Sequence, residues 1–332
     1  MTYKYSFFAA LLIAIPFSAL SFPAYAADNR ETTFTDPTDA GPDFGLQGEY
    51  KGTIETKDGE DEFGAQVIAL GNGTFNVVGY YGGLPGDGWK RGDEQKSVEG
   101  KAANGAIAVQ IENSDIVISD GKITITVDGE TRGTLTKIDR QSPTIGEKPP
   151  ADAIVLFDGT SVDQFDNGQI VDGKWLAATN VATKQKFGDH HLHIEFRTPF
   201  MPTARGQGRG NSGVYVQGRY EVQVLDSFGL KGANNECGGI YTIAEPIVNM
   251  CLPPLSWQTY DMDFTAARYD DDGKKTANAR VTIRQNGVLI HDDLELPHGT
   301  PGYHAEGPEP DSIFLQNHGN PVVFRNFWVV SK

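Results

Sequence analysis

Residues 279–291 read ARVTIRQNGVLIH, and this stretch decides the fold class. Apolar and polar residues alternate before Asn286-Gly287, and aliphatic residues follow it. This dipeptide is typical of a tight turn between two antiparallel strands. Alternation with a period of two places one face of a strand in the core and the other face outside. The stretch therefore predicts a β-hairpin.

The same strand character extends over the C-terminal part of the chain. From residue 153 onward, at least nine segments have it, and no helical pattern separates them. The segments are 191–197, 213–217, 220–225, 239–243, 259–265, 279–285, 288–291, 312–316 and 322–330. Many strands without intervening helices predict an all-β fold, a jelly-roll sandwich over residues 153–332.

A smaller β region precedes the jelly roll. Residues 46–141 contain short alternating segments joined by turns such as Gly71-Asn72-Gly73 and Asp120-Gly121. No window of about 12 residues there has the 3.6-residue period of a helix. We expect an accessory antiparallel β domain, either a sandwich or a partly closed barrel. Residues 142–152, SPTIGEKPPAD, are rich in proline and predict a stiff linker.

The N-terminus predicts export. Lys4 precedes an apolar run over residues 7–20, and residues 24–26 (AYA) form a small-residue cleavage site. We expect residues 1–26 to be a secretory signal peptide and the polar residues 27–45 to be a disordered linker. A membrane anchor is the alternative, but the apolar run is short for a bilayer. The mature protein is expected in the periplasm or outside the cell, without stable membrane insertion.

The net charge and the two cysteines argue against a nucleic-acid partner and against a zinc site. The chain has 44 acidic and 28 basic residues, and a net charge of −16 repels phosphate backbones, so we expect no nucleic-acid partner. Export would permit a disulfide between Cys237 and Cys251, and two free buried thiols are the alternative. Their spacing is not that of a zinc site.

The segment 190–197, HHLHIEFR, carries an unusual density of titratable residues. Its apolar residues share one parity, so His193, Glu195 and Arg197 are expected together on the opposite sheet face. A solvated face with a ladder of charges is the plain alternative. A functional site is the more specific interpretation.

A second segment, 220–226 (YEVQVLD), strengthens the functional interpretation. Glu221 and Gln223 share a face, and Asp226 would join them only through a β-bulge. The spacing resembles the E-x-D-x-x-E strand of laminarinase-type glycoside hydrolases. Gln223 stands where that strand has its middle carboxylate, which weakens an assignment to two-carboxylate chemistry.

A third segment, 316–326 (QNHGNPVVFRN), places His318 at a turn between two terminal strands. From there its side chain could lean over the mouth of a cleft, and a turn-capping histidine is the alternative. Arg325 has the opposite parity to its apolar neighbour Phe324.

Several motifs together resemble the 3-keto-disaccharide hydrolase domain family over about residues 153–331. They are VLFDGT at 155–160, NSGVY at 211–215, YEVQVLD at 220–226, WQTYD at 257–261, QNHG at 316–319 and FRN at 324–326. The N-terminal β domain resembles an accessory part of planctomycete-type members. The resemblance implies a concanavalin- or laminin-G-like jelly roll that acts on 3-keto sugars.

A ketone at carbon 3 acidifies the proton on carbon 2, so a base can remove it and the substituent on carbon 1 can leave. Such an enzyme needs a base, an acid and a group that stabilises the enolate. We expect His193, Glu221 and His318 to be catalytic; alternatively, these three could bind a divalent cation that polarises the ketone. We expect His193, Glu195, Arg197, Glu221, Gln223 and His318 to converge on one concave face.

Further residues are expected to bind a glycoside or oligosaccharide substrate. They are Glu195, Arg197, Asn211, Gln223, Asp226, Tyr241, Trp257, Gln316 and Arg325. Two other functions stay open. A carbohydrate-binding module could use Tyr215, Tyr241, Trp257 and Tyr303 as aromatic platforms, and an ordinary glycosidase could use Glu195 and Glu221.

Overall fold

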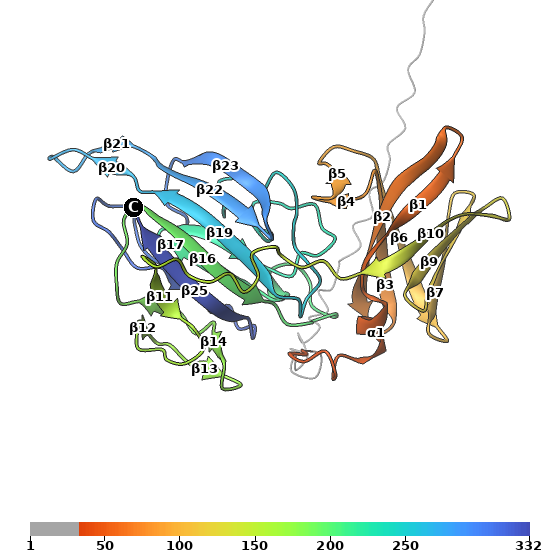
Figure 1. Cartoon of the computed structure of the whole chain (residues 1–332), viewed down its shortest axis with the longest axis horizontal. Coiled ribbons are helices and arrows are strands. Elements are labelled where there is room, and N and C mark those ends of the chain that lie inside the picture. The colour runs from red at the N-terminus through yellow and green to blue at the C-terminus, as the bar shows by residue number, and fades with distance from the viewer. Residues whose placement is uncertain (1–32) are drawn as a thin grey trace, which may run out of the picture. The chain divides into compact units, whose positions relative to one another are not determined.

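The computed structural model describes residues 33–332, so the expected signal peptide at 1–26 lies outside the described residues (Figure 1). The described part is almost entirely β-structure, as expected. It contains one α-helix, α1 (Gly41–Leu46), and one short 3-10 helix, η2 (Gly206–Gly208). Within these residues, no helix has the length and apolar character needed to cross a bilayer.

The first β region is a closed antiparallel barrel, rather than a sandwich or a partly closed barrel. Its eight strands are β1 (Gly48–Thr56), β2 (Gly59–Gly71), β3 (Thr74–Tyr81), β6 (Gln95–Ala103), β7 (Ala106–Ile111), β8 (Ser114–Ser119), β9 (Lys122–Val127) and β10 (Glu130–Ile138). The barrel closes because β1 pairs with both β2 and β10. Asp120 and Asp128 have positive φ and each precedes a glycine, the conformation that tight hairpins require.

Residues 33–45 are ordered, which differs from the disordered segment expected over 27–45. Phe34 forms an isolated β-bridge with Phe200, and the ring of Phe44 on α1 packs edge-on against the same Phe200 ring. These aromatic side chains contact the barrel core, which includes Tyr50 and Phe75. Burial of apolar surface therefore holds this segment in place.

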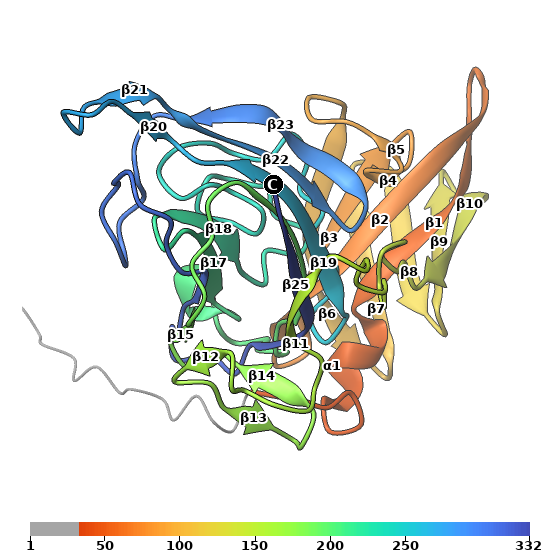
Figure 2. The same cartoon turned by 60° about the vertical axis from the view of Figure 1, so that its left-hand side comes forward.

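The second β region is a jelly-roll sandwich, as expected, and Figure 2 separates its two sheets. The larger sheet contains β13 (Ile170–Val171), β14 (Trp175–Ala177), β25 (Val323–Ser331), β16 (His190–Arg197), β19 (Gln258–Thr265), β22 (Ala279–Gln285), β23 (Val288–Leu296) and, beside β25, β11 (Ile154–Phe157). The smaller sheet contains β12 (Phe165–Asp166), β15 (Val181–Thr183), β24 (Phe314–Leu315), β17 (Ser212–Val216) and β18 (Tyr220–Val224). Short two-stranded pairs complete the fold: β4 (Leu84–Pro85) with β5 (Gly88–Trp89), and β20 (Arg268–Tyr269) with β21 (Lys275–Ala277).

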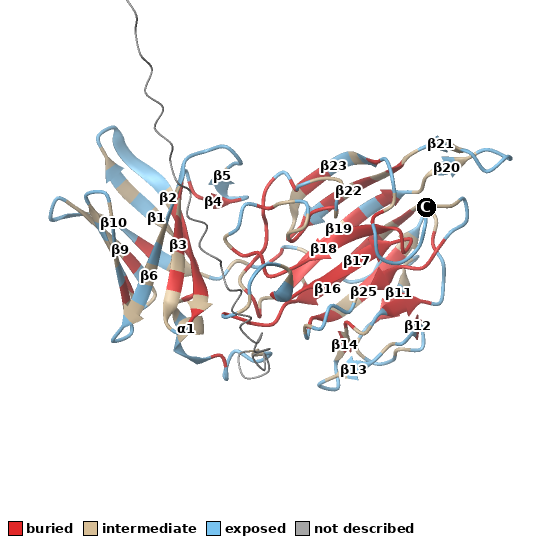
Figure 3. Cartoon of the chain, turned by 180° about the vertical axis from the view of Figure 1, so that it is seen from behind, coloured by how far each residue is buried: buried red, intermediate tan, exposed pale blue. Residues whose placement is uncertain are grey.

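The main apolar core lies between the two jelly-roll sheets (Figure 3). Leu192 and Ile194 reach it from β16, and Val222 and Val224 reach it from β18. Because side chains alternate along a strand, the residues between them point away from this core. The outward residues of β16 and β18 therefore lie on opposite outer faces of the sandwich.

The proline-rich segment after β10 crosses the outer face of the larger sheet (Figure 1). The Ser142 hydroxyl lies 2.6 Å from the Thr259 hydroxyl on β19, and the Gly146 amide donates to Glu195 on β16 at 2.6 Å. The segment, which we call the strap (residues 142–147), is thus bound to the sheet. Elsewhere, Cys237 and Cys251 are free and buried, so the second of the two alternatives for them is right.

Candidate active site

The β17–β18 hairpin carries a carboxylate on the outer face of the smaller sheet. Glu221 lies between Tyr220 and Val222 on β18, whose side chains belong to the core, so its own side chain points outward. On β17, Tyr215 is its direct cross-strand partner, and Gly213 is the partner of Gln223. A Cβ at position 213 would collide with the Glu221 carboxylate. The glycine therefore lets that carboxylate lie across β17.

Glu221 is a strongly perturbed acid. It is only 4% exposed, and burial raises its pKa to about 7, although interaction with the Tyr215 hydroxyl opposes the shift. A buried carboxyl prefers the neutral form because little water or positive charge stabilises the anion. Burial, and then the charge of Glu221, also raise the pKa of Tyr215, so this hydroxyl keeps its proton. The pair places a base of near-neutral pKa beside a hydrogen-bond donor.

A polar pocket of about 200 Å³ opens onto Glu221. It is lined by Gln207, Asn211, Tyr215, Glu221, Gln223, Tyr241, Pro301, Gly302, Gln316 and His318. The Gln223 amide donates to Gln207 and Asn211, both at 3.1 Å, and the Gln316 amide donates to the Tyr215 hydroxyl at 3.2 Å. Side chains fixed in this way present oriented donors and acceptors, which suits a ligand with many hydroxyl groups.

His318 reaches the pocket from the loop that follows β24. Two asparagine side chains fix this loop. The backbone N–H of Asn317 donates to the Asn180 side chain at 2.8 Å, and the backbone N–H of Asn211 donates to the Asn320 side chain at 2.7 Å. The histidine is exposed and lines the pocket mouth. This position matches the expectation that it leans over a cleft.

The structure brings together six of the residues expected in the site. They are Asn211, Glu221, Gln223, Tyr241, Gln316 and His318. Gln207 was not predicted as a site residue, and Tyr215 was predicted only as an aromatic platform of a binding module. A signal for Tyr215 was present, because a tight turn at Gln217-Gly218 pairs it directly with Glu221. Gln207 lies on η2, which no pattern predicted.

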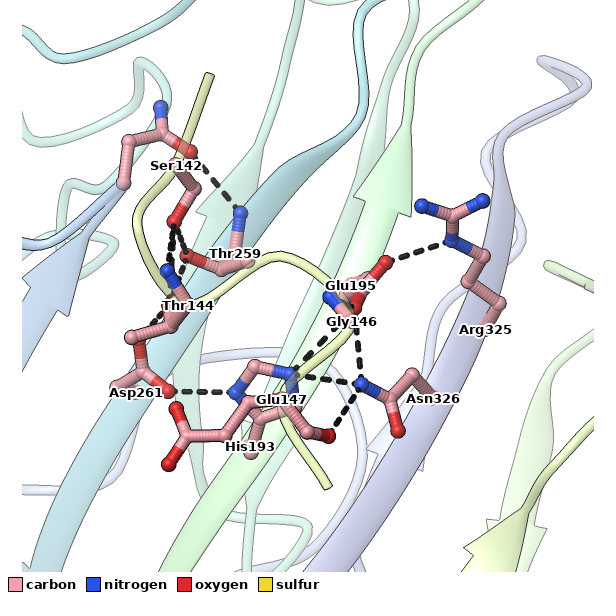
Figure 4. Close-up of polar contacts among 11 residues, drawn as sticks. Ser142, Thr144, Gly146, Glu147, His193, Glu195, Thr259, Asp261, Arg325 and Asn326 are labelled. Atoms are coloured by element: carbon pink, nitrogen blue, oxygen red, sulfur yellow. Dashed lines mark hydrogen bonds and ion pairs between the residues drawn. The ribbon is translucent and has the colours of Figure 1, made fainter. Parts of the chain in front are cut away.

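The expected convergence of six residues on one face is wrong, because β16 lies in the other sheet. His193 and Glu195 are both fully buried on the outer face of the larger sheet, under the strap (Figure 4). His193 Nδ1 lies 2.6 Å from Asp261, and its ring stacks on Trp328 at 5.0 Å. Glu195 accepts from Arg325 Nε at 2.6 Å. These groups are paired and covered by the chain itself.

The pKa values of this cluster are those of a stable ion network. Burial alone would lower the pKa of His193, but hydrogen bonds to Asp261 and Glu195 outweigh burial and raise it to about 9. Burial alone would raise the pKa of Glu195, but hydrogen bonds from His193, Asn326, Gly146 and Arg325 lower it to about 2. Both groups are therefore charged near neutral pH, and their charges hold the strap on the sheet.

Two further expectations fail for the same topological reason. His193, Glu221 and His318 cannot bind one divalent cation, because the first points out from the larger sheet and the other two line the pocket on the smaller one. Glu195 and Glu221 cannot flank one glycosidic bond either. Among the described residues, the group whose ligand atoms lie within 4.8 Å of one another is Glu147, His193 and Asp261, and His193 Nδ1 already lies 2.6 Å from Asp261.

The remaining expected substrate-binding residues lie elsewhere. Arg197 lies over the Trp175 ring at 4.1 Å, and Arg325 lies over the Trp257 ring at 4.0 Å, both outside the Glu221 pocket. Asp226 does not join Glu221 through a bulge. It accepts from Arg209 Nε at 2.6 Å in a buried ion pair.

Comparisons with known proteins agree with the jelly roll. A family model described as a 3-keto-alpha-glucoside-1,2-lyase-like domain matches residues 152–330. A crystal structure of a candidate glycosyl hydrolase from Parabacteroides distasonis is 33% identical, with a TM-score of 0.51, over 55% of this chain and 85% of that chain. A second candidate glycosyl hydrolase from the same organism is 16% identical, with a TM-score of 0.39, over 54% of this chain and 94% of that one. No curated protein matches.

Proposed function

Because the chain belongs to the 3-keto-alpha-glucoside-1,2-lyase-like family and is a carbohydrate-active enzyme, we propose that it cleaves the glycosidic bond of 3-keto-glycosides in the Glu221 pocket. The cleavage proceeds by removal of the carbon 2 proton, elimination of the aglycone and addition of water. We also propose that the enzyme is exported, on the signal-peptide pattern of residues 1–26.

The raised pKa of Glu221 carries this proposal. A general base works best when its pKa lies near the working pH, and burial raises the pKa of this carboxyl to about 7. The carbon 2 proton is acidic only because the carbanion left behind is the enolate of the carbon 3 ketone. One desolvated base is therefore enough to begin the reaction on a 3-keto sugar.

The proposed reaction is an elimination followed by the addition of water. Glu221 takes the proton from carbon 2, the electron pair forms a carbon 1–carbon 2 double bond, and the aglycone leaves carbon 1 with its oxygen. His318 at the pocket mouth donates a proton to that oxygen. Tyr215, which keeps its proton, donates a hydrogen bond to the enolate oxygen. Water then adds to carbon 1 and a proton returns to carbon 2, so the net reaction is hydrolysis.

The number of carboxylates in the pocket favours this route over ordinary glycosidase chemistry. Retaining and inverting glycosidases place two carboxyl groups around the scissile bond. Among the described residues that line the pocket, Glu221 is the one carboxylate. The amides of Asn211, Gln223 and Gln316 suit recognition of sugar hydroxyls rather than proton transfer.

A paired substrate experiment tests the proposal. The enzyme is incubated with an aryl 3-keto-glucoside and with its unoxidised parent, each with hydrogen or deuterium at carbon 2. We expect cleavage of the keto substrate alone, with a primary isotope effect on kcat/KM. Equal cleavage of the parent glucoside without an isotope effect would contradict the proposal and point to an oxocarbenium mechanism.

A further inference from the structure

The barrel has a closed end and an open end. Near α1, inward side chains such as Tyr50, Phe75 and Ile118 are completely buried. Toward the opposite end, the inward side chains Ile54 and Ile116 stay partly exposed, although they have the same parity on the same strands as the buried ones. The inside of the barrel is therefore filled at one end and hollow at the other.

The hollow is an apolar cavity of about 220 Å³. Its walls include Phe63, Val77, Val98, Ile116, Ile123, Ile125 and Leu135. Gly79 also lines it, and a Cβ there would press against the Phe63 ring. Apolar walls in contact with water favour an occupant that removes this contact, by about 25 cal/mol for each Å² covered. Closed eight-stranded barrels are wide enough to hold one small ligand in this way.

The rim of the cavity selects against a charged occupant. Lys96 is paired with Glu112 at 3.1 Å, and Arg132 is paired with Glu55 at 3.6 Å. All four residues line the cavity. Each cation already has an anion beside it, so no free charge faces the interior from this set. A charged ligand would lose hydration without gaining a counterion.

We propose that the barrel is a binding site for one small uncharged apolar molecule, of the size of one or two fused rings. The occupant enters at the end bounded by these ion pairs and covers the partly exposed side chains of Ile54, Val98 and Ile116. The site is distinct from the Glu221 pocket, since it lies inside the other β region. It gives the barrel a function of its own, independent of the proposed reaction.

Fluorescence of N-phenyl-1-naphthylamine, an uncharged apolar probe that brightens in apolar cavities, tests the proposal on the full chain. Ile116→Trp fills the cavity from β8. Val117→Trp adds the same side chain at the neighbouring position, which is 41% exposed and points away from the interior. We expect one saturable site in the wild type and in Val117→Trp, and at least about tenfold weaker binding in Ile116→Trp.

A second variant covers the case in which Ile116→Trp fails to fold. Ile116→Asn adds no volume at a position that is already partly exposed, and its folding is checked by circular dichroism. It should still weaken binding severalfold, because it removes apolar wall. In the wild type, 1-naphthol should displace the probe and trehalose should not. Absence of a saturable site, equal binding by all variants, or displacement by trehalose would overturn the proposal.

Discussion

Each outer face of the jelly roll carries a buried glutamate, and the two glutamates differ in how many hydrogen bonds they accept. On the larger sheet, Glu195 accepts hydrogen bonds from Gly146, Arg325 and Asn326, and the strap covers it. On the smaller sheet, Glu221 faces an open polar pocket with the Tyr215 hydroxyl beside it. One carboxylate is held by a complete set of partners, and the other is desolvated with few.

The pKa values express this difference directly. Partners lower the pKa of Glu195 to about 2, whereas burial raises that of Glu221 to about 7. A carboxylate such as Glu195, whose hydrogen bonds are all made within the protein, stabilises the fold but is not free to act on a substrate. A buried carboxylate such as Glu221, which has few partners, destabilises the fold and is available for proton transfer. Density of titratable residues along a strand therefore does not identify a catalytic site; incomplete pairing next to an open pocket does.

The largest effect is expected when each glutamate is replaced by glutamine. Glu221→Gln removes the proposed base and should lower kcat/KM for a 3-keto-glucoside by about 100- to 10,000-fold. Glu195→Gln makes the same chemical change on the other face and should leave kcat/KM within a few-fold, measured where the variant is folded. Initial rates from pH 5 to 9 give the comparison. Equal losses in both variants would show that the two faces do not differ in this way.

The second effect concerns stability. His193→Ala leaves the buried Glu195 and the partly buried Asp261 without their shared cation, so we expect a loss of about 3–5 kcal/mol in the free energy of unfolding. Because the pKa of His193 is raised in the folded state, its contribution is complete below pH 6.5 and lost as pH rises through about 9. Urea unfolding at pH 6 and pH 10 should show a large and a small difference, respectively.

The same variant separates structure from catalysis. Below its melting temperature, His193→Ala should keep kcat/KM within a few-fold of the wild type, in contrast to the catalytic role expected from the sequence. A large loss of turnover in the folded protein, with unchanged unfolding, would restore that catalytic role.

The sequence allowed the orientation of each side chain to be predicted, but not the sheet to which its strand belongs. Parity placed Glu221 and Gln223 outside, and the structure agrees. Parity also placed His193 outside, which is right. However, β16 pairs with β19 and β25 in the larger sheet, whereas β18 pairs with β17 in the smaller one, so His193 and Glu221 lie on opposite outer faces. This pairing joins residues far apart in the sequence, such as His190 with Phe264 and with Ser331, and the alternation within a single strand carries no information about it.

The strap was unpredictable for a related reason. Prolines and a glycine in residues 142–152 indicated a stiff connection, but composition alone does not indicate what the connection binds to. What binds it is a set of single contacts, such as Thr144 to Asp261 at 2.7 Å and Asn326 to the Glu147 carbonyl at 3.0 Å. Each contact depends on the register of two strands far away in the sequence. The fold class, by contrast, followed from repeated local patterns and was confirmed.

A third expected effect is a gain in stability, in contrast to the loss expected for His193→Ala. Glu221→Gln should stabilise the protein at high pH, because the raised pKa means that ionisation of Glu221 disfavours the folded state. Below about pH 4.5 the group is neutral in both states and the variant should match the wild type. As pH rises to about 7 and above, the wild type should become less stable than the variant by up to about 3 kcal/mol. Thermal unfolding at pH 4.5 and pH 8 measures this.

A variant less stable than the wild type at pH 8 would show that Glu221 has partners that the pocket geometry does not reveal. Glu195→Gln is the matched control. Its pKa is lowered, so its charge contributes stability above pH 4.5, and that variant should be destabilised at pH 8.

The smallest effect is expected from Gly213→Ala. The new methyl group would occupy the space across which the Glu221 carboxylate lies, and a flexible side chain can rotate away from it at little cost in stability. The displaced base should lower kcat by about tenfold, about 1.4 kcal/mol in activation free energy, while unfolding changes little. Gly188→Ala is the control, because a Cβ at position 188 meets nothing within 4 Å. Unchanged kcat in Gly213→Ala would mean that the position of the carboxylate above β17 is not the reactive one.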